Sequence, residues 1–376
     1  MNKFKCHACA GNEFEEDTRF KMLKRVTSDC RPWPSGGEKL QCKKCGLIQS
    51  NCDQRWKSEC QNIYSGYDLF YQSDGEEQPI FIAGGLSDGR SNLVLDHIQE
   101  SIKQSEYIKV LDVGCGNGGF LSATSKRFPG LELYGLESGN KYENRVRAIS
   151  GVVDFYQSEI DQIQNSFDLV TMIHVLEHID NPIKFLKSLR EKIKPGGALF
   201  VQIPDCSKNP FDLLVADHSS HFSVRTLSEI LKAAGASNIK ISTQAVTKEI
   251  SAWVTFDDKH NDYIESEPET VELKNLITKV CAIRDSINSD ISEGREVAIF
   301  GTSNSGTWLA NEADLNIKYF VDEDEARVGR RHLNIPIIRP NQLSDEIVLH
   351  VPLSMDVLKM ILPRLPKKLT IRAIQD

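Results

Sequence analysis

The chain lacks the long hydrophobic runs and the cationic surplus that would point to a membrane or to nucleic acid. No run approaches the roughly 18 consecutive apolar residues that a membrane-spanning helix needs. Lysine and arginine number 45 against 53 aspartate and glutamate, and no basic stripe stands out, so we do not expect nucleic acid as a partner. The first residues also lack the apolar core of a secretory signal, which favours a cytoplasmic protein.

Cysteine is plentiful, with ten residues, and the absence of an export signal favours thiols or metal ligands over disulfides. Four of the cysteines form two Cys-x-x-Cys pairs, Cys6 with Cys9 and Cys42 with Cys45. Four thiolates in two close pairs suit a tetrahedral Zn²⁺ with no open coordination position. We therefore predict a structural zinc site in an N-terminal module over residues 1–78. Free thiols or a redox dithiol are the alternatives, and His7 is a rival ligand.

A glycine-rich loop is the most informative motif of the chain. An apolar strand ending at Val113 runs into a loop that carries Gly114, Gly116 and Gly118. Glycines at alternate positions let the backbone turn tightly and approach a ligand closely. The next strand ends at Glu137, where a doubly wound sheet holds ribose hydroxyls. Taken alone, this pattern also fits a nicotinamide-binding domain.

Four segments in order narrow that choice: VLDVGCGNG, GLES, FDLVTMIHVLEHI and IKPGGALFVQIPD. Together they resemble the class I S-adenosylmethionine-dependent methyltransferases. The resemblance implies an α/β fold, with a seven-stranded Rossmann-like sheet over residues 79–256 whose last hairpin is antiparallel. It also implies that Asp112 and the loop face the methionine part of the cofactor and Glu137 the ribose. The expected cofactor-binding residues are Asp112, Gly114, Cys115, Gly116, Asn117, Glu137, Ser138, Gln157, Ser158 and His174.

A second candidate site follows the fifth strand, in the loop over residues 211–223. Ligands bind at the carboxyl ends of strands in open α/β sheets, and this loop carries Asp217, His218 and His221. A histidine beside an aspartate suits proton removal, because it titrates near neutral pH and a carboxylate can orient it. We predict His218 as the general base, ahead of His221, although both could be structural. For His178 we expect a packing role.

The C-terminal third, residues 257–376, repeats the theme of strand, glycine loop and helix around Gly301 and Gly306. The following strand ends at Asp322, so we expect a small Rossmann-like domain after a helical connector. Glycine loops at helix N-termini suit phosphate groups, which a nucleotide-linked substrate would supply. A scaffold or dimerisation domain is the alternative.

The three-part layout resembles the zinc-containing sugar C-methyltransferases of bacterial deoxysugar pathways. The matching segments are CHAC…CKKCGLIQ, YSGYDLFYQS, VLDVGCGNG, ADHSSHFS and FGTSNSG. This resemblance implies an enzyme that methylates a nucleotide-activated keto sugar, with Tyr67 or Tyr71 as a catalytic tyrosine and Asp217 in place of the usual glutamate. The sequence leaves open whether the protein is a monomer or a homodimer. A sugar O-methyltransferase with the same base, a non-catalytic cofactor-binding scaffold, and a protein or small aromatic acceptor are the alternatives.

Overall fold

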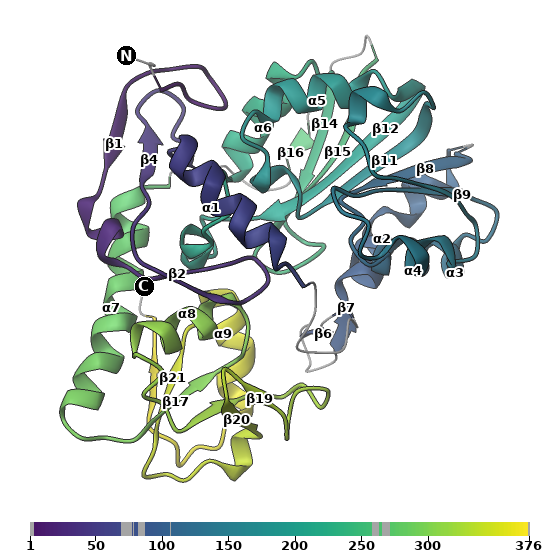
Figure 1. The fold of residues 1–376 in the computed structure, drawn as a ribbon. Helices are drawn as coiled ribbons and strands as arrows, with labels where there is room; N and C mark the ends of the chain where they lie inside the picture. Colours follow the sequence, from purple (N-terminus) through teal and green to yellow (C-terminus); the bar gives the residue numbers. More distant parts are fainter. Residues whose placement is uncertain are drawn as a thin grey trace.

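The computed structural model describes residues 4–68, 77, 79–81, 87–105, 107–257, 263–264 and 271–374. In Figure 1 the purple N-terminal module lies against both the teal central domain and the green and yellow C-terminal domain. Within the described residues, no helix is long and apolar enough to cross a membrane.

The N-terminal module is a small sheet completed by the central domain. Its order is β1-β4-β5-β13, where β13 (Ser220–His221) comes from the loop that carries the candidate base. The other strands are β1 (Phe14–Glu16), β4 (Lys39–Cys42) and β5 (Ile48–Ser50), and a separate pair joins β2 (Arg25–Val26) to β3 (Pro32–Trp33). Helix α1 (Gln54–Ser65) follows, and the Asp53 side chain caps it by accepting from the Trp56 N–H.

The central sheet has the order β10-β9-β8-β11-β12-β15-β14-β16. Its first five strands run parallel, and β15 pairs antiparallel with both β12 and β14, as the sequence predicts. The sheet has one strand more than the seven expected: the short strand β16 pairs parallel with β14 at the edge. The strands are β8 (Lys109–Val113), β9 (Glu132–Leu136), β10 (Val152–Tyr156), β11 (Phe167–Ile173), β12 (Ile193–Pro204), β14 (Asn238–Ser242), β15 (Glu249–Thr255) and β16 (Tyr263–Ile264).

Helices cover this sheet because its central strands are apolar on both faces. The residues of β8 from Val110 to Val113 are all buried, which is typical of a parallel strand between helical layers. The helices are α2 (Arg90–Lys103), α3 (Gly119–Arg127), α4 (Glu143–Arg147), α5 (Pro182–Arg190) and α6 (Val224–Ala233), and the hairpin of β6 (Pro79–Phe81) and β7 (Ser87–Gly89) precedes them.

The C-terminal domain is a second, smaller Rossmann-like unit. Its sheet order is β19-β20-β18-β17-β21-β22, with the parallel core β20-β18-β17-β21-β22. The strands are β17 (Val297–Phe300), β18 (Tyr319–Val321), β19 (Arg331–His332), β20 (Ile335–Ile338), β21 (Val348–Val351) and β22 (Ile371–Ala373), and the helices are α7 (Leu273–Ser292), α8 (Asn304–Glu312) and α9 (Met355–Ile361).

One hydrophobic cluster joins the three parts around the loop of the candidate base. It contains Phe20 and Val26 of the N-terminal module, Phe211 and Val215 of the loop, and Trp308 of α8. The indole N–H of Trp308 also donates to the carbonyl of Lys24 at 3.0 Å. The loop is therefore held from two sides, which fixes the position of the side chains it carries.

Candidate active site

The glycine loop after β8 has the backbone conformation that only glycine adopts easily. Gly114, Gly116 and Gly118 have φ values of +67°, +51° and +82°, in the left-handed region. A Cβ on Gly114 would also lie 2.4 Å from Cγ2 of Val175, which no side chain could tolerate. The loop is therefore built to keep its backbone exposed to a ligand and close to the strand ends.

Glu137 is connected to this loop by hydrogen bonds. The N–H of Gly116 donates to Oε2 of Glu137 at 2.9 Å, and the N–H of Ser138 donates to Oε1 at 2.8 Å. Cys115 and Asn117 are both buried, and the Cys115 sulfur faces Gly135, so that thiol packs into the sheet. Of the residues expected near the adenine, Gln157 is exposed and Ser158 half-buried just after β10, and their roles stay predictions.

Asp112 is a buried carboxylate at the end of β8. It is 3% exposed, and Oδ1 accepts a hydrogen bond from the Thr171 hydroxyl at 2.7 Å. Burial, and secondarily the charge of Glu137, raises the pKa of Asp112 to about 7. No ion pair within the described part of the chain relieves this cost. A cationic group of a bound ligand would stabilise the carboxylate, so the site fits S-adenosylmethionine, which carries both an amine and a sulfonium.

His174 lies at the end of β11, between two carboxylates. Its Nδ1 is 3.1 Å from Oε1 of Glu177, and its Nε2 is 3.2 Å from Oε2 of Glu249, which also pairs with Arg90. Burial disfavours the charged ring, but Glu249 outweighs it and raises the pKa of His174 to about 9. His174 is therefore an imidazolium near neutral pH, which suits positioning and not proton removal.

The candidate base His218 is oriented by Asp212 in the 3₁₀ helix η5 (Pro210–Leu214). His218 Nδ1 lies 2.9 Å from Oδ1 of Asp212, and His221 Nδ1 lies 2.6 Å from Oδ2. Burial alone would raise the pKa of Asp212, but His221 and His218 outweigh it and hold that pKa far below its usual range. Among the described residues, none hydrogen-bonds Nε2 of His218, so this nitrogen is available to a ligand.

Asp217 does not orient His218, contrary to the expectation from their adjacency. Its carboxylate accepts from the N–H of Ser28 at 2.9 Å and from the Ser28 hydroxyl at 2.5 Å, and Nδ1 of His178 lies 3.4 Å from Oδ2. The chain turns at residues 216–217, so the two neighbouring side chains project in different directions. Asp217 therefore anchors the loop to the N-terminal module through Ser28 and pairs with His178.

His178 belongs to the site, although the sequence suggested a packing role. Its ring is perpendicular to that of His218, with 4.7 Å between centroids, and its Nδ1 lies 3.1 Å from the Tyr64 hydroxyl. Burial lowers the pKa of His178, but Asp217 outweighs it and the pKa is raised. The roles of Asp212 and His178 become visible only when η5 and the turn after β11 are known to converge.

The remaining predicted catalytic residues take different places. His221 is 1% exposed in β13, and burial together with the positive charge of Lys39 lowers its pKa to about 4, so it is neutral and structural in position. The ring of Tyr67 meets that of Tyr64 edge-on at 6.0 Å, on the His178 side of the site. Tyr71 lies outside the described residues.

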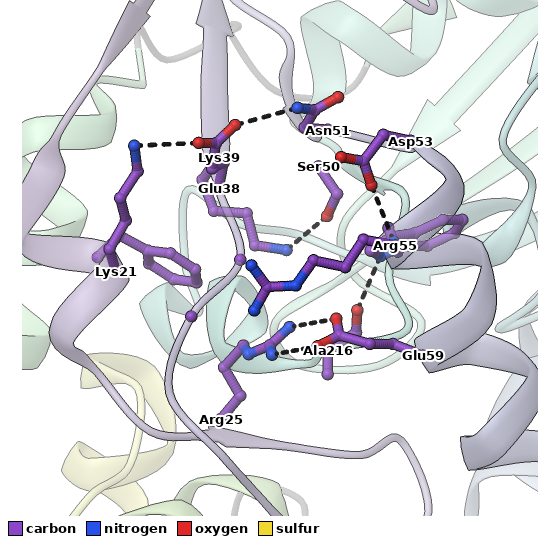
Figure 2. Close-up of a pocket in the computed structure, with 14 residues that line it drawn as sticks. Lys21, Arg25, Glu38, Lys39, Ser50, Asn51, Asp53, Arg55, Glu59 and Ala216 are labelled. Atoms are coloured by element: carbon purple, nitrogen blue, oxygen red, sulfur yellow. Dashed lines mark hydrogen bonds and ion pairs between the residues drawn. The ribbon is translucent and has the colours of Figure 1, made fainter.

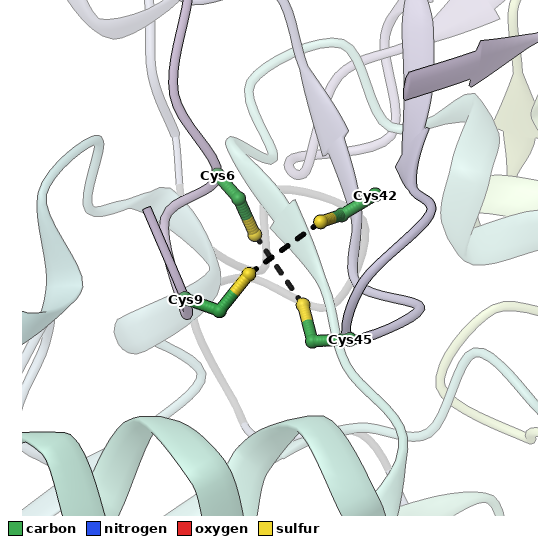
Figure 3. A group of neighbouring side chains, drawn as sticks. All are labelled: Cys6, Cys9, Cys42 and Cys45. Carbon is green, nitrogen blue, oxygen red and sulfur yellow. Dashed lines mark hydrogen bonds between the residues drawn. The ribbon is translucent and has the colours of Figure 1, made fainter. Parts of the chain in front are cut away.

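The four N-terminal cysteines converge, as Figure 3 shows. The Cys6 and Cys45 sulfurs are 3.4 Å apart, those of Cys9 and Cys42 are 3.5 Å apart, and all four lie within 4.8 Å of one another. These separations exclude disulfides, whose sulfurs are about 2.05 Å apart. They are close to the spacing around a tetrahedral Zn²⁺ with bonds of about 2.3 Å. His7 is engaged elsewhere, with Nδ1 2.8 Å from the Ser220 hydroxyl.

Comparison with known proteins supports the assignment of the central domain. Residues 87–241 match the model of a methyltransferase domain family. The ubiquinone biosynthesis O-methyltransferase of Proteus mirabilis is 27% identical over 180 residues, which are 46% of this chain and 69% of the relative. The trans-aconitate 2-methyltransferase of Deinococcus radiodurans is 31% identical over 137 residues, 36% of this chain and 49% of the relative.

The match covers less than two thirds of most curated relatives of this kind. For example, the chain spans 36% of the mitochondrial ubiquinone biosynthesis O-methyltransferase of Schizosaccharomyces pombe. Among solved structures, an S-adenosylmethionine-dependent methyltransferase from Clostridium acetobutylicum is 13% identical with a TM-score of 0.37, over 55% of this chain and 99% of that chain. The matched family model shows a methyltransferase domain over residues 87–241, and the glycine loop and the buried Asp112 lie within it.

Proposed function

We propose that the protein methylates a nucleotide-linked keto sugar at the carbon next to the ketone, with His218 as the general base. The observation that carries the proposal is the pairing of His218 with Asp212 at Nδ1, which leaves Nε2 facing no described partner. An imidazole fixed in this way, with one nitrogen on a carboxylate and the other facing no described partner, is suited to proton removal. The three-part sequence resemblance supplies the acceptor class.

In this proposal His218 and His178 have different roles, because their environments differ. His218 accepts the C–H proton at Nε2, and the Asp212 carboxylate stabilises the imidazolium that forms. Asp217 raises the pKa of His178, which favours its protonated form as the donor to the enolate oxygen that develops. The Tyr64 hydroxyl holds the His178 ring at its Nδ1. S-adenosylmethionine, when bound at the Asp112 loop, supplies the electrophilic methyl group on its sulfonium.

The N-terminal loop over residues 27–31 supports an acceptor that spans two domains. Ser28 in this loop bonds Asp217 beside the histidines, and the Cys30 thiol donates to Oδ1 of Asn304 at 2.7 Å. Asn304 is the first residue of α8, directly after the C-terminal glycine loop. A nucleotide sugar that spans this loop would place its sugar at His218, on the Ser28 side, and its nucleotide at α8, on the Cys30 side.

O-methylation of a sugar hydroxyl is the second candidate. The same base would then remove an O–H proton. The deciding test incubates the protein with methyl-labelled S-adenosylmethionine and a panel of keto and non-keto nucleotide sugars, with mass analysis of the products. Methylation of a keto sugar, lost in His218→Gln and kept in the surface variant His97→Gln, supports the proposal. If only non-keto sugars are methylated, the acceptor atom is a hydroxyl oxygen and not a carbon. If the protein binds the cofactor but forms no product, a nucleotide sugar is not the acceptor.

We also propose that the four-cysteine cluster holds one structural Zn²⁺. Cys6, Cys9, Cys42 and Cys45 would provide a closed coordination shell, and the turns at both knuckles place the sulfurs toward one centre. Metal analysis of the purified chain tests this: one zinc per chain, lost in Cys42→Ser, is expected. A metal-free chain with normal stability would contradict it.

A further inference from the structure

A cavity of about 310 Å³ lies in the N-terminal module and reaches Ala216 of the loop that carries His218 (Figure 2). It is formed by the 3₁₀ helix η1 (Thr18–Met22), the segment over residues 36–39, the end of β5 and the start of α1, with Ala216 at its floor. Its charged lining residues are Lys21, Arg25, Lys39, Arg55, Glu38, Asp53 and Glu59.

The three acids of this cavity are engaged by the protein itself. Both carboxylate oxygens of Glu59 accept from Arg25, at 3.0 and 2.9 Å. Glu38 is 3.0 Å from the Lys21 ammonium and accepts from the amide of Asn51 at 3.0 Å. Asp53 accepts from the N–H of Trp56 as the cap of α1. Three of the seven charged side chains therefore have little capacity left for a ligand.

Within the described residues, two of the cations, Lys39 and Arg55, form no ion pair with a carboxylate. Lys39 is 4% exposed, and within the described residues its ammonium donates only to the Ser50 hydroxyl, at 2.8 Å. Burial lowers the pKa of Lys39 to about 7; the charge of Asp212 opposes this shift and that of Arg25 adds to it. Arg55 has no hydrogen bond or ion pair within the described part of the chain, and Figure 2 shows its guanidinium in the cavity without a dashed line. A buried ammonium with one neutral partner is costly, so it is seldom present without a role.

We propose that this cavity binds the phosphate group of a small molecule between Lys39 and Arg55. Two unpaired cations match the charge of a phosphate dianion, and the planar fork of arginine matches its oxygens. Gly36 and Gly37 add no side chain to the lining, and a Cβ on Gly36 would lie 3.0 Å from Nη2 of Arg55, so a larger residue there would crowd the guanidinium. The volume is at the lower end of ligand pockets, which suits a phosphorylated metabolite or one end of a larger one.

Occupancy of this site bears directly on the catalytic loop. The Ser50 hydroxyl, which accepts from Lys39, donates to the carbonyl of His218 at 2.7 Å, and the indole N–H of Trp56 donates to the carbonyl of Ala216 at 3.0 Å. A phosphate that draws Lys39 toward it changes the hydrogen bond that holds the loop. The site thus lies behind the base, and its existence does not depend on the identity of the methyl acceptor.

The test is calorimetric titration of the full chain with inorganic phosphate and with pyrophosphate, at constant ionic strength set by chloride. We expect saturable binding at one site. Arg55→Gln and the isosteric Lys39→Met should each weaken it about tenfold or more, because each removes a charge-assisted hydrogen bond. Lys57→Gln, which lies on the same helix outside the cavity, should leave the affinity unchanged.

Two results would overturn the proposal: no saturable binding to the natural chain, or equal affinity in Arg55→Gln. If Lys39→Met fails to fold by circular dichroism, the exposed Arg55 variant still decides. Competition identifies the source of the phosphate. Displacement by a nucleoside diphosphate supports the site as the anchor of a nucleotide sugar, and phosphate binding without displacement supports it as a separate site for a small phosphorylated compound.

Discussion

At the residue scale, the site depends on which carboxylate meets which histidine. Asp212 contacts His218, and Asp217 contacts His178. The residues His218, Asp217 and Asp112 were evident in the sequence because each sits at a strand end or in a motif. Asp212 was not, because its distance to His218 depends on the turn between them, and sequence spacing alone does not report that turn.

His218→Gln should lower the turnover of methyl transfer by about 10² to 10⁴, the usual contribution of a general base, while cofactor binding is unchanged. Asp212→Asn should lower turnover as well, because the amide cannot stabilise the imidazolium. Steady-state kinetics beside calorimetric cofactor binding would show this. If His218→Gln loses cofactor affinity and keeps its turnover, the assignment of the base is wrong.

His174 should make folding stability depend on pH. Its pKa is raised to about 9 in the folded protein against an ordinary value of 6.5. Its contribution is therefore complete below pH about 6.5 and is lost as the pH rises toward 9, with a size of roughly 1–3 kcal/mol. Denaturant unfolding of the natural chain and of His174→Gln at pH 6 and 9 measures it. The stability difference between the two proteins should shrink at pH 9, and a constant difference would contradict the charge assignment.

At the element scale, the turns after β8 and β11 build the site. The antiparallel last hairpin was predictable from the family resemblance, and the glycine loop from its motif. The contribution of β13 to the N-terminal sheet was not predictable, because a two-residue strand pairing with β5 leaves no periodic pattern.

Gly114→Ala should destabilise the protein by about 1–3 kcal/mol and weaken cofactor binding, because its φ is left-handed and its Cβ would collide with Val175. Gly130→Ala is the matched control, since a Cβ there meets nothing within 4 Å. Thermal unfolding and cofactor titration of both variants provide the comparison. Equal behaviour of the two would show that the loop geometry is wrong.

At the scale of the whole molecule, the N-terminal module ties the catalytic loop to both other domains. Its cysteines Cys6, Cys42 and Cys45 belong to the same hydrophobic cluster as Leu227 and Ile230 of the central domain. The sequence indicated three parts but not this shared core, because packing between distant segments has no local signature.

Removal of the proposed Zn²⁺ should therefore affect more than the module. Treatment with a strong chelator, or Cys42→Ser, should lower the unfolding temperature and also reduce methyl transfer, since β13 and the loop lose their anchor. Cys52→Ser, outside the cluster, serves as the control. Loss of zinc without any change in stability or activity would contradict this coupling.

The most direct test of the central claim is hydrogen exchange at the acceptor carbon, followed by nuclear magnetic resonance in deuterated water without the methyl donor. A keto sugar bound to the natural chain should exchange the proton next to its ketone, and His218→Gln should abolish this exchange. Methylation of the keto sugar that proceeds normally in His218→Gln, with no exchange in the natural chain, would contradict His218 as the base.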